Sequence, residues 1–313
     1  MEEEKARKVT YGAMMIGLFV VLLAVSLYVP LIGALAMFFI PLPIILYRIK
    51  YNRTASIFVM MTGIVLSMFV GGIVLIPFGF LYGLLGLIIG DTIATKKSKL
   101  YTFMATGTTL LILTITSYVA AIVVFKVNFI DAIMDGARAS QKQVITFFEK
   151  SGELPEGFEE QLGASLTLTE ISFPSTFIIF TFILAFIFVS LNLLIVKRLG
   201  NDVKSFPPFQ DMKLPLITVW YYLVVMLWGL FFEMKIGTTS FLIYTNASII
   251  LRFMFFLQGV SFINYSLKEM KLPKWAIVIL TLFAFPLYPI TVLLGVLDTG
   301  LNVRAWIGKN KAK

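Results

Sequence analysis

The chain has 313 residues, of which 59% are hydrophobic and only 14% are charged, whereas a soluble domain carries roughly 25% charged residues. Its mean hydropathy of +0.93 and its continuous apolar runs of roughly 20 residues indicate membrane-spanning helices. A membrane β-barrel would instead alternate apolar and polar residues in segments of about ten. Because cysteine and histidine are both absent, the sequence excludes disulfides, thiolate or imidazole metal ligands and cysteine nucleophiles.

The apolar runs predict an all-α polytopic transmembrane helix bundle of 8–9 spans. The first eight runs are Tyr11–Val29, Leu31–Tyr47, Ala55–Val70, Gly71–Asp91, Tyr101–Phe125, Phe173–Val196, Leu216–Phe232 and Thr238–Tyr265. The first lacks a small-residue cleavage site before Pro30, so we expect a retained span and not a signal peptide. The last run, Trp275–Leu297, contains Pro286 and Pro289. It either crosses once with a kink or folds as a broken, re-entrant segment.

The character of the sequence changes at residues 126–171, which are polar and rich in acidic residues. Amphipathic patterns in this stretch predict two short helices on or above the bilayer. We therefore divide the chain into a five-span membrane module at 1–125, an extracytoplasmic helical insert at 126–171, and a three- to four-span module at 172–313.

The net charge of +9 is explained by short basic loops beside the spans, so nucleic acid is not an expected partner. With a cytoplasmic N-terminus, the cytoplasmic side collects most of these bases. They are Lys5, Arg7, Lys8, Arg48, Lys50, Arg53, Lys96, Lys97, Lys99, Lys197, Arg198, Lys204, Lys213, Lys268, Lys271 and Lys274. The opposite side has Lys126, Arg138, Lys142, Lys150 and Lys235. A full ninth crossing, which the length of Trp275–Leu297 favours, leaves the basic tail outside, and a re-entrant segment leaves it inside.

Two stripes of small residues are candidate packing or partner-docking faces. One lies in the fourth span and consists of Gly79, Gly83, Gly86 and Gly90. The other lies in the first span and consists of Ala13, Gly17 and Ala24. Each stripe favours close packing within the bundle, and the alternative is a face that docks or slides against a partner subunit.

Arg252 is the candidate ligand-binding residue, because an arginine at membrane depth is costly and usually faces a cavity or a partner. Tyr244 and Ser248 precede it by eight and four residues, so the three side chains share one helix face. This face predicts a contact with a small anionic ligand; the alternative is a buried ion pair or a side chain that reaches the inner surface. Asn192, Gln258 and Asn264 are predicted to form interhelical hydrogen bonds.

The sequence gives no catalytic, metal-binding or cofactor site. It has no HExxH, GxSxG or P-loop motif. An intramembrane aspartyl site needs two acids at membrane depth, and the candidates Asp91, Glu233 and Asp298 lie at span ends. We therefore expect a protein that is not an enzyme.

Several segments together resemble the YybS-like family of multi-pass membrane proteins from Gram-positive bacteria. They are KARKVTYGAMMIG at 5–17, PLPIILYRIKYNR at 41–53, the glycine-rich fourth span, FPPFQDMKLP at 206–215, FLQGVSFINY at 256–265 and LGVLDTGLNVR at 294–304. The resemblance covers nearly the whole chain and implies no catalytic signature. The first five spans also resemble the S components of energy-coupling-factor vitamin transporters, whose first helix docks a coupling subunit through small residues. S components are shorter and lack an insert like 126–171.

From these observations we expect an integral protein of the bacterial cytoplasmic membrane that binds or transports a small molecule, resembling an S component. The lipid bilayer and a membrane coupling subunit are then its partners. The alternative is a membrane scaffold or assembly factor that docks client proteins through the insert at 126–171.

Overall fold

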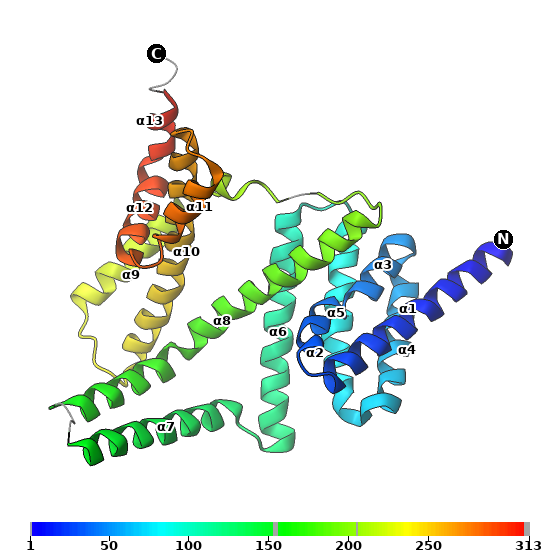
Figure 1. Ribbon diagram of the computed structural model, residues 1–313, viewed down its shortest axis with the longest axis horizontal. Helices are drawn as coiled ribbons and strands as arrows, with labels where there is room; N and C mark the ends of the chain where they lie inside the picture. Colours follow the sequence, from blue (N-terminus) through cyan, green and yellow to red (C-terminus); the bar gives the residue numbers. More distant parts are fainter. Residues whose placement is uncertain (1, 153–155, 205, 310–313) are drawn as a thin grey trace. The chain divides into compact units, whose positions relative to one another are not determined.

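The computed structural model describes residues 2–152, 156–204 and 206–309, and this part of the chain contains helices and no strand (Figure 1). Seven of the described helical segments are long and apolar enough to cross a membrane, and the apolar helices Ile217–Phe231 and Tyr288–Leu301 are shorter. The predicted all-α polytopic bundle is therefore confirmed. The chain forms two compact units, Met1–Phe129 with Phe180–Phe206, and Ile130–Ile179 with Pro207–Lys313. The boundary expected at 171/172 falls inside one long helix.

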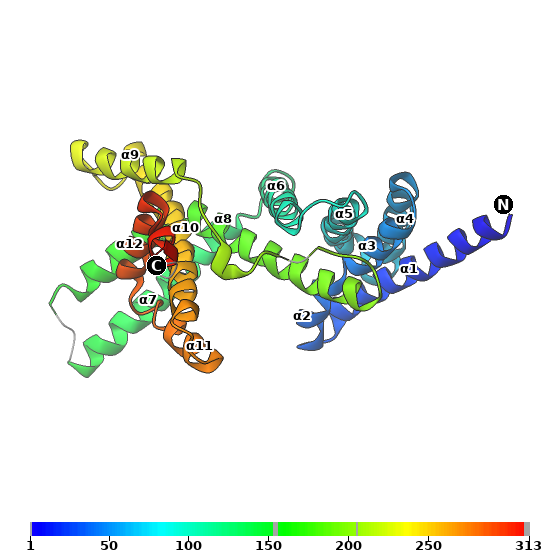
Figure 2. The same cartoon turned by 90° about the horizontal axis from the view of Figure 1, so that it is seen from above.

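The first unit contains the N-terminal helices and the second half of α8. Its elements are α1 (Glu2–Tyr28), α2 (Ile32–Ala36), η1 (Met37–Phe39), α3 (Leu42–Lys50), α4 (Arg53–Gly71), η2 (Gly72–Val74), α5 (Leu75–Ala94), α6 (Lys99–Phe125) and part of α8 (Phe158–Arg198). Figure 2 looks along α4, α5 and α6, which lie in a row. The second predicted span is broken, because α2, η1 and α3 form it in succession.

Polar caps and apolar packing define the helices of the first unit. Asn52 begins α4 by accepting a hydrogen bond from the amide of Ala55, and Ser98 begins α6 in the same way. Phe19 of α1 is fully buried at the centre of a core that includes Ile44 of α3 and other apolar side chains of α3, α4 and α5. In lipid, such contacts stabilise a bundle through close packing more than through removal of apolar surface from water.

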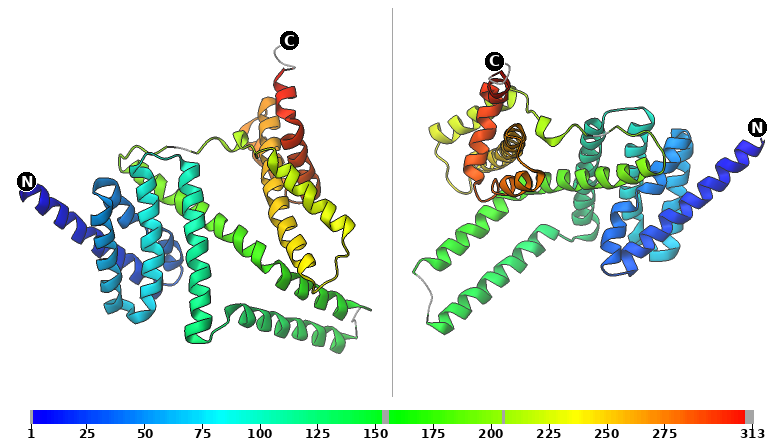
Figure 3. Two further views of the ribbon diagram at one scale, coloured as in Figure 1. Left: turned by 180° about the vertical axis from the view of Figure 1, so that it is seen from behind. Right: turned by 45° about the horizontal axis from the view of Figure 1, so that its top comes forward.

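The second unit contains α7 (Phe129–Ser151) from Ile130 onward, the first half of α8, and the C-terminal helices. The latter are η3 (Phe209–Asp211), α9 (Ile217–Phe231), α10 (Thr239–Glu269), α11 (Lys274–Leu282), α12 (Tyr288–Leu301) and α13 (Val303–Lys309). Helix α7 runs beside the first half of α8 (Figure 3), and Arg138 links the two through Glu170. The part of the expected insert from Phe158 onward is thus continuous with the sixth span, while α7 is a separate helix.

Helix α8 passes through Pro174, close to the start of the predicted sixth span. Proline removes one backbone donor and distorts the preceding turn. The amide of Ser175 donates to Oδ1 of Asn246 at 2.8 Å. The Nδ2 group of Asn246 donates to the carbonyl of Ile171, also at 2.8 Å. One side-chain amide from α10 therefore bonds to two backbone groups beside Pro174, within a helix that continues for 41 residues.

The segment predicted as the last span is a hairpin of two short helices, α11 and α12, joined by residues 283–287. Contacts between α10 and α12 advance in the same direction along both helices. Phe256 stacks on Tyr288 at 5.1 Å between ring centroids, and Gln258, further along α10, bonds to Asp298. Since α12 runs parallel to α10, α11 must return along α10 in the opposite direction. This hairpin agrees with the re-entrant alternative, and the segment is not the single continuous helix that a full ninth crossing would use. The end of α12 lies at the same end of the unit as Lys268.

Candidate functional site

The hairpin tip, residues 283–288, lies beside the middle of α10 and next to Arg252. Phe256, one turn after Arg252, contacts both Phe285 and Tyr288, with ring centroids 5.3 Å and 5.1 Å apart. Arg252 lies near enough to Tyr288 for its charge to act on the phenol. The tip therefore combines a cation, a phenol and the N-terminus of the 14-residue helix α12. A helix N-terminus attracts negative charge, so this arrangement favours an anion.

Arg252 is exposed, near the middle of the 31 residues of α10, and no carboxylate in the described part of the chain pairs with it. Its predicted companions are in different surroundings. Ser248 is buried, and its hydroxyl has no hydrogen-bond partner among the described residues. The ring of Tyr244 packs against Gly229 of α9. The three side chains share a face of α10, but the structure does not enclose them in one cavity.

A second polar group, here called the polar cluster, lies toward the other end of the hairpin. It consists of Gln258 and Ser261 from α10, Asp298 from α12, and Arg304 from α13. Arg304 donates from Nε to Oδ2 of Asp298 at 2.8 Å, and these side chains are only 4% and 1% exposed. Gln258 donates from Nε2 to the same Asp298 oxygen at 2.6 Å.

The polar cluster also fixes the chain between η3 and α9. Arg304 donates to the carbonyl of Gln210 and, at 3.1 Å, to the hydroxyl of Ser261. Ser261 donates to the carbonyl of Phe209 at 2.7 Å. The side-chain oxygen of Gln258 accepts from the amide of Leu214 at 3.0 Å. One buried network therefore holds three segments together.

Those three segments are among the ones that carry the family resemblance: FPPFQDMKLP, FLQGVSFINY and LGVLDTGLNVR. From the sequence, Asp298 is an acid at a span end and Arg304 is part of the basic tail, and neither position predicts their pairing. The signal was Asn302, which ends α12 in the left-handed conformation with φ of 50°. Asparagine tolerates this conformation, and the turn brings Arg304 back toward Asp298. The interhelical hydrogen bond predicted for Gln258 is confirmed, as is that of Asn192, whose side chain donates to the carbonyl of Phe38 at 2.8 Å.

The chemistry of the polar cluster is that of a structural ion pair with two unused acceptors. Oδ1 of Asp298 and Oε1 of Gln210 are buried without partners among the described residues. Asp91 and Glu233 have their own basic partners, Arg48 at 2.7 Å and Lys235 at 2.9 Å. No group of three or more acidic side chains within the described residues is placed to hold a metal ion.

The two small-residue stripes have different surroundings. Each α5 glycine faces α4 or the region of α3. Gly79 and Gly83 face α4. Gly86 faces Pro41, just before α3, and Ile44 of α3, and Gly90 faces Ile45 and Arg48 of α3. The α1 stripe is open, since Ala13 and Gly17 are exposed and a Cβ added at Gly17 would meet nothing within 4 Å.

The tightest approach between helices involves glycines that the sequence analysis did not single out. Gly259 of α10 and Gly295 of α12 face each other's helix so closely that an added Cβ would collide with a backbone carbonyl, that of Thr291 or Phe255. This crossing brings the backbones of α10 and α12 into direct contact between the hairpin tip and the polar cluster.

Comparison with known proteins identifies relatives of this chain. A family model described as "Predicted membrane protein (DUF2232)" matches residues 17–299. The chain is 28% identical over 308 residues to "Uncharacterized protein YybS" of Bacillus subtilis (strain 168), covering 96% of this chain and 98% of the relative. These findings confirm the resemblance to YybS-like proteins. No solved structure matches the chain, and neither finding supports the weaker resemblance to S components.

Proposed function

Because the chain belongs to the DUF2232 family of predicted membrane proteins, we propose that it is a binding or transport component for a small anion in the bacterial cytoplasmic membrane. The observation that carries the proposal is Arg252, which pairs with no carboxylate among the described residues and lies near the middle of α10, beside the tip of the α11–α12 hairpin. Ionisable residues at membrane depth usually serve a ligand pathway or a partner. Broken helices whose N-termini face an anionic group are a recurring design of transporters.

The hairpin supports the same proposal through its backbone. Residues 283–287 are not helical along their length, and lipid cannot satisfy free backbone groups. Irregular backbone at membrane depth is tolerated where it is packed in protein or lines a polar cavity. In this proposal, Arg252 and Tyr288 contact the ligand, while the polar cluster holds the hairpin in register. The proposal includes no catalytic step and no cofactor.

A partner subunit belongs to the proposal because of the open stripe on α1. The small residues Ala13 and Gly17 allow another helix to approach closely, and both are exposed among the described residues. A coupling subunit that docks there agrees with the S-component likeness of residues 1–125. Such a subunit would supply the energy for transport, since the sequence has no P-loop.

The test is to purify the full chain in mild detergent and identify bound small molecules by mass spectrometry. We expect a stoichiometric anionic compound in the unmodified protein and in Lys235→Gln, and its loss in Arg252→Gln. Lys235 is a matched control because its charge is exposed and already paired with Glu233. Retention of the compound by Arg252→Gln, or equal loss from both variants, would contradict the proposal.

The alternative function, a scaffold that docks client proteins through residues 126–171, is favoured by the apolar surface of α7. Phe129, Ile133, Val144 and Phe147 are exposed large apolar side chains on this helix. If this is the function, Phe147→Glu will remove co-purifying proteins, and Arg252→Gln will leave them unchanged. The opposite pattern supports the anion-binding component.

A further inference from the structure

A groove in the first unit combines basic side chains with an apolar wall. It lies between the start of α6, the last turns of α8 and the segment that follows α8, and it measures about 500 Å³. Its lining residues are Lys99, Ser190, Leu193, Leu194, Lys197, Arg198, Val203 and Lys204. Four of the eight are cationic and none is acidic.

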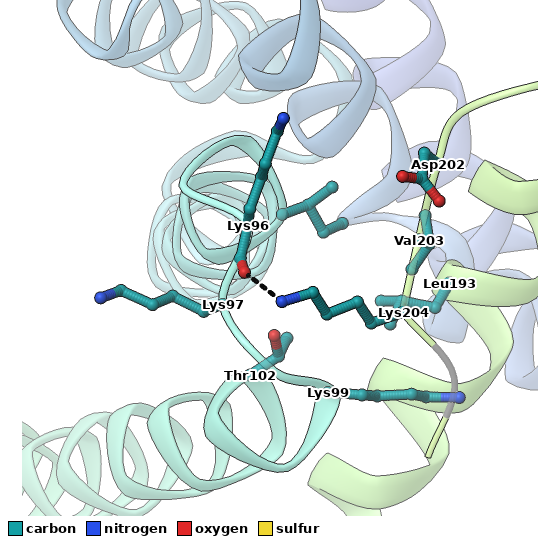
Figure 4. A pocket seen from close by; sticks show the side chains of 9 residues that line it. Lys96, Lys97, Lys99, Thr102, Leu193, Asp202, Val203 and Lys204 are labelled. Carbon is teal, nitrogen blue, oxygen red and sulfur yellow. Dashed lines mark hydrogen bonds between the residues drawn. The ribbon is translucent and has the colours of Figure 1, made fainter. Parts of the chain in front are cut away.

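A narrower cavity adjoins the groove and shares Lys99 and Lys204 with it (Figure 4). The ammonium group of Lys204 reaches across this cavity and donates to the carbonyl of Lys96 at 2.9 Å. The side chains of Lys96 and Lys97 extend away from its centre. Asp202 lines this cavity, but it does not line the groove.

The positive charges of the groove are not neutralised within the described part of the chain. No ion pair involves Lys99, Lys197, Arg198 or Lys204 there, and the charges of Lys99 and Lys197 repel each other. The ammonium group of Lys99 lies 4.1 Å from the centre of the Phe206 ring. An anion in the groove would relieve the repulsion, and the N-terminus of α6 would add to the attraction.

The wall of the groove that α8 forms is apolar, in contrast to the basic side chains at its end. Leu193 is buried and Leu194 is 50% exposed, one turn before the charged end of α8. The hydroxyl of Ser190, on the same stretch, is buried and has no partner among the described residues. A free inorganic anion would need only the basic end, whereas a lipid would use both ends, with its headgroup on the cations and an acyl chain along the leucines.

We propose that this groove binds the phosphate headgroup of an anionic phospholipid. Basic pockets between membrane helices on the cytoplasmic side bind such headgroups. The predicted orientation places the start of α6 and the end of α8 on that side. The lipid site is independent of the anion site at Arg252, because its residues belong to the other unit.

The test uses the full chain, purified and stripped of lipid, with native mass spectrometry to measure binding of added phosphatidylglycerol. Phosphatidylcholine and inorganic phosphate serve as separate probes. The key variant is Lys99→Gln/Lys197→Gln/Lys204→Gln, and the control is Lys268→Gln/Lys271→Gln/Lys274→Gln, which removes the same charge from another exposed basic cluster. Phosphatidylglycerol should bind the key variant at least about tenfold more weakly than the unmodified protein or the control.

A second variant, Leu194→Asp, places a negative charge in the groove at a side chain that is already half exposed, so it tests the site if the triple variant does not fold. It should also lose phosphatidylglycerol. Equal binding by all variants, equal loss from the control, or equal binding of phosphatidylcholine would overturn the proposal. Inorganic phosphate that competes fully with the lipid would show a free-phosphate site and would overturn the lipid assignment.

Discussion

The ion pair between Arg304 and Asp298 gives the sharpest test of the second unit. The change Arg304→Gln keeps a polar side chain of similar reach but removes the cation. It removes the 2.8 Å bond to Asp298 and the 3.1 Å bond to Ser261. It also removes the contact with the Tyr265 ring, whose centre lies 5.4 Å from the guanidinium carbon. Asp298, with a side chain only 1% exposed, would then be a buried carboxylate without a counter-charge.

The expected cost follows from that burial. Removing one partner of a buried ion pair costs about 3–5 kcal/mol, because the remaining charge stays desolvated. A loss of about 1 kcal/mol in the free energy of unfolding lowers Tm by about 2–4 °C in a unit of 150–250 residues. We use the smaller shift of about 2 °C. Arg304→Gln should therefore lower Tm by about 6–10 °C. The double variant Arg304→Gln/Asp298→Asn should recover part of this loss, because it leaves no unpaired charge.

Thermal unfolding of the purified protein in detergent, followed by tryptophan fluorescence, measures these shifts. Arg138→Gln is the matched control, since Arg138 also pairs with acids but its side chain is 56% exposed. Exposed ion pairs contribute about 0–1 kcal/mol, so its Tm should fall by about 2 °C or less. Equal shifts for Arg304→Gln and Arg138→Gln would refute the reasoning, as would a double variant as unstable as the sum of its parts.

Three further tests address the packing of the helices, two by thermal unfolding and one by protease accessibility. Asn246→Ala should cost about 2–6 kcal/mol, because it strands two backbone groups at the Pro174 distortion at about 1–3 kcal/mol each; a Tm unchanged from the parent would show that water or lipid satisfies them. Gly259→Ala should prevent α12 from docking on α10 and expose the hairpin to protease, and a protease-resistant variant would contradict the close crossing. Gly86→Ala should lower Tm because its new methyl group would lie 2.6 Å from a backbone carbonyl, whereas Gly17→Ala should not; equal effects of the two would show that the stripes do not differ.

The features that the sequence predicted are those that depend on local periodicity. The glycines of α5 follow the helical repeat, so one short stretch suffices to place them on a common face. Membrane spans depend only on the length of an apolar run. The position of Arg252 in a span could be read in the same way, and its lack of a carboxylate partner agrees with the absence of acids near it in the sequence.

The features that escaped prediction depend on contacts between distant segments. Helix α8 continues through Pro174, and the side chain that bonds to its backbone there is Asn246, 71 residues after Ser175. The path of the last segment depends on the close crossing of α10 and α12 at Gly259 and Gly295. No sequence repeat within either helix predicts this crossing. The pairing of Asp298 with Arg304 requires both the hairpin and the turn at Asn302, so neither residue alone carried a signal.

The parallel pairing of α10 and α12 also dictates the order in which the C-terminal part can assemble. Helices of 9 and 14 residues are each shorter than the roughly 20 residues that a bilayer crossing needs. The hairpin therefore has no stable position in lipid until α10 is present as a surface for its backbone. Helix α10 must therefore enter the membrane first, and the hairpin that follows it in the chain then docks against it. A nascent chain truncated after Pro273 should thus integrate normally, while a chain without α10 should present residues 274–301 to the quality-control proteases of the cell.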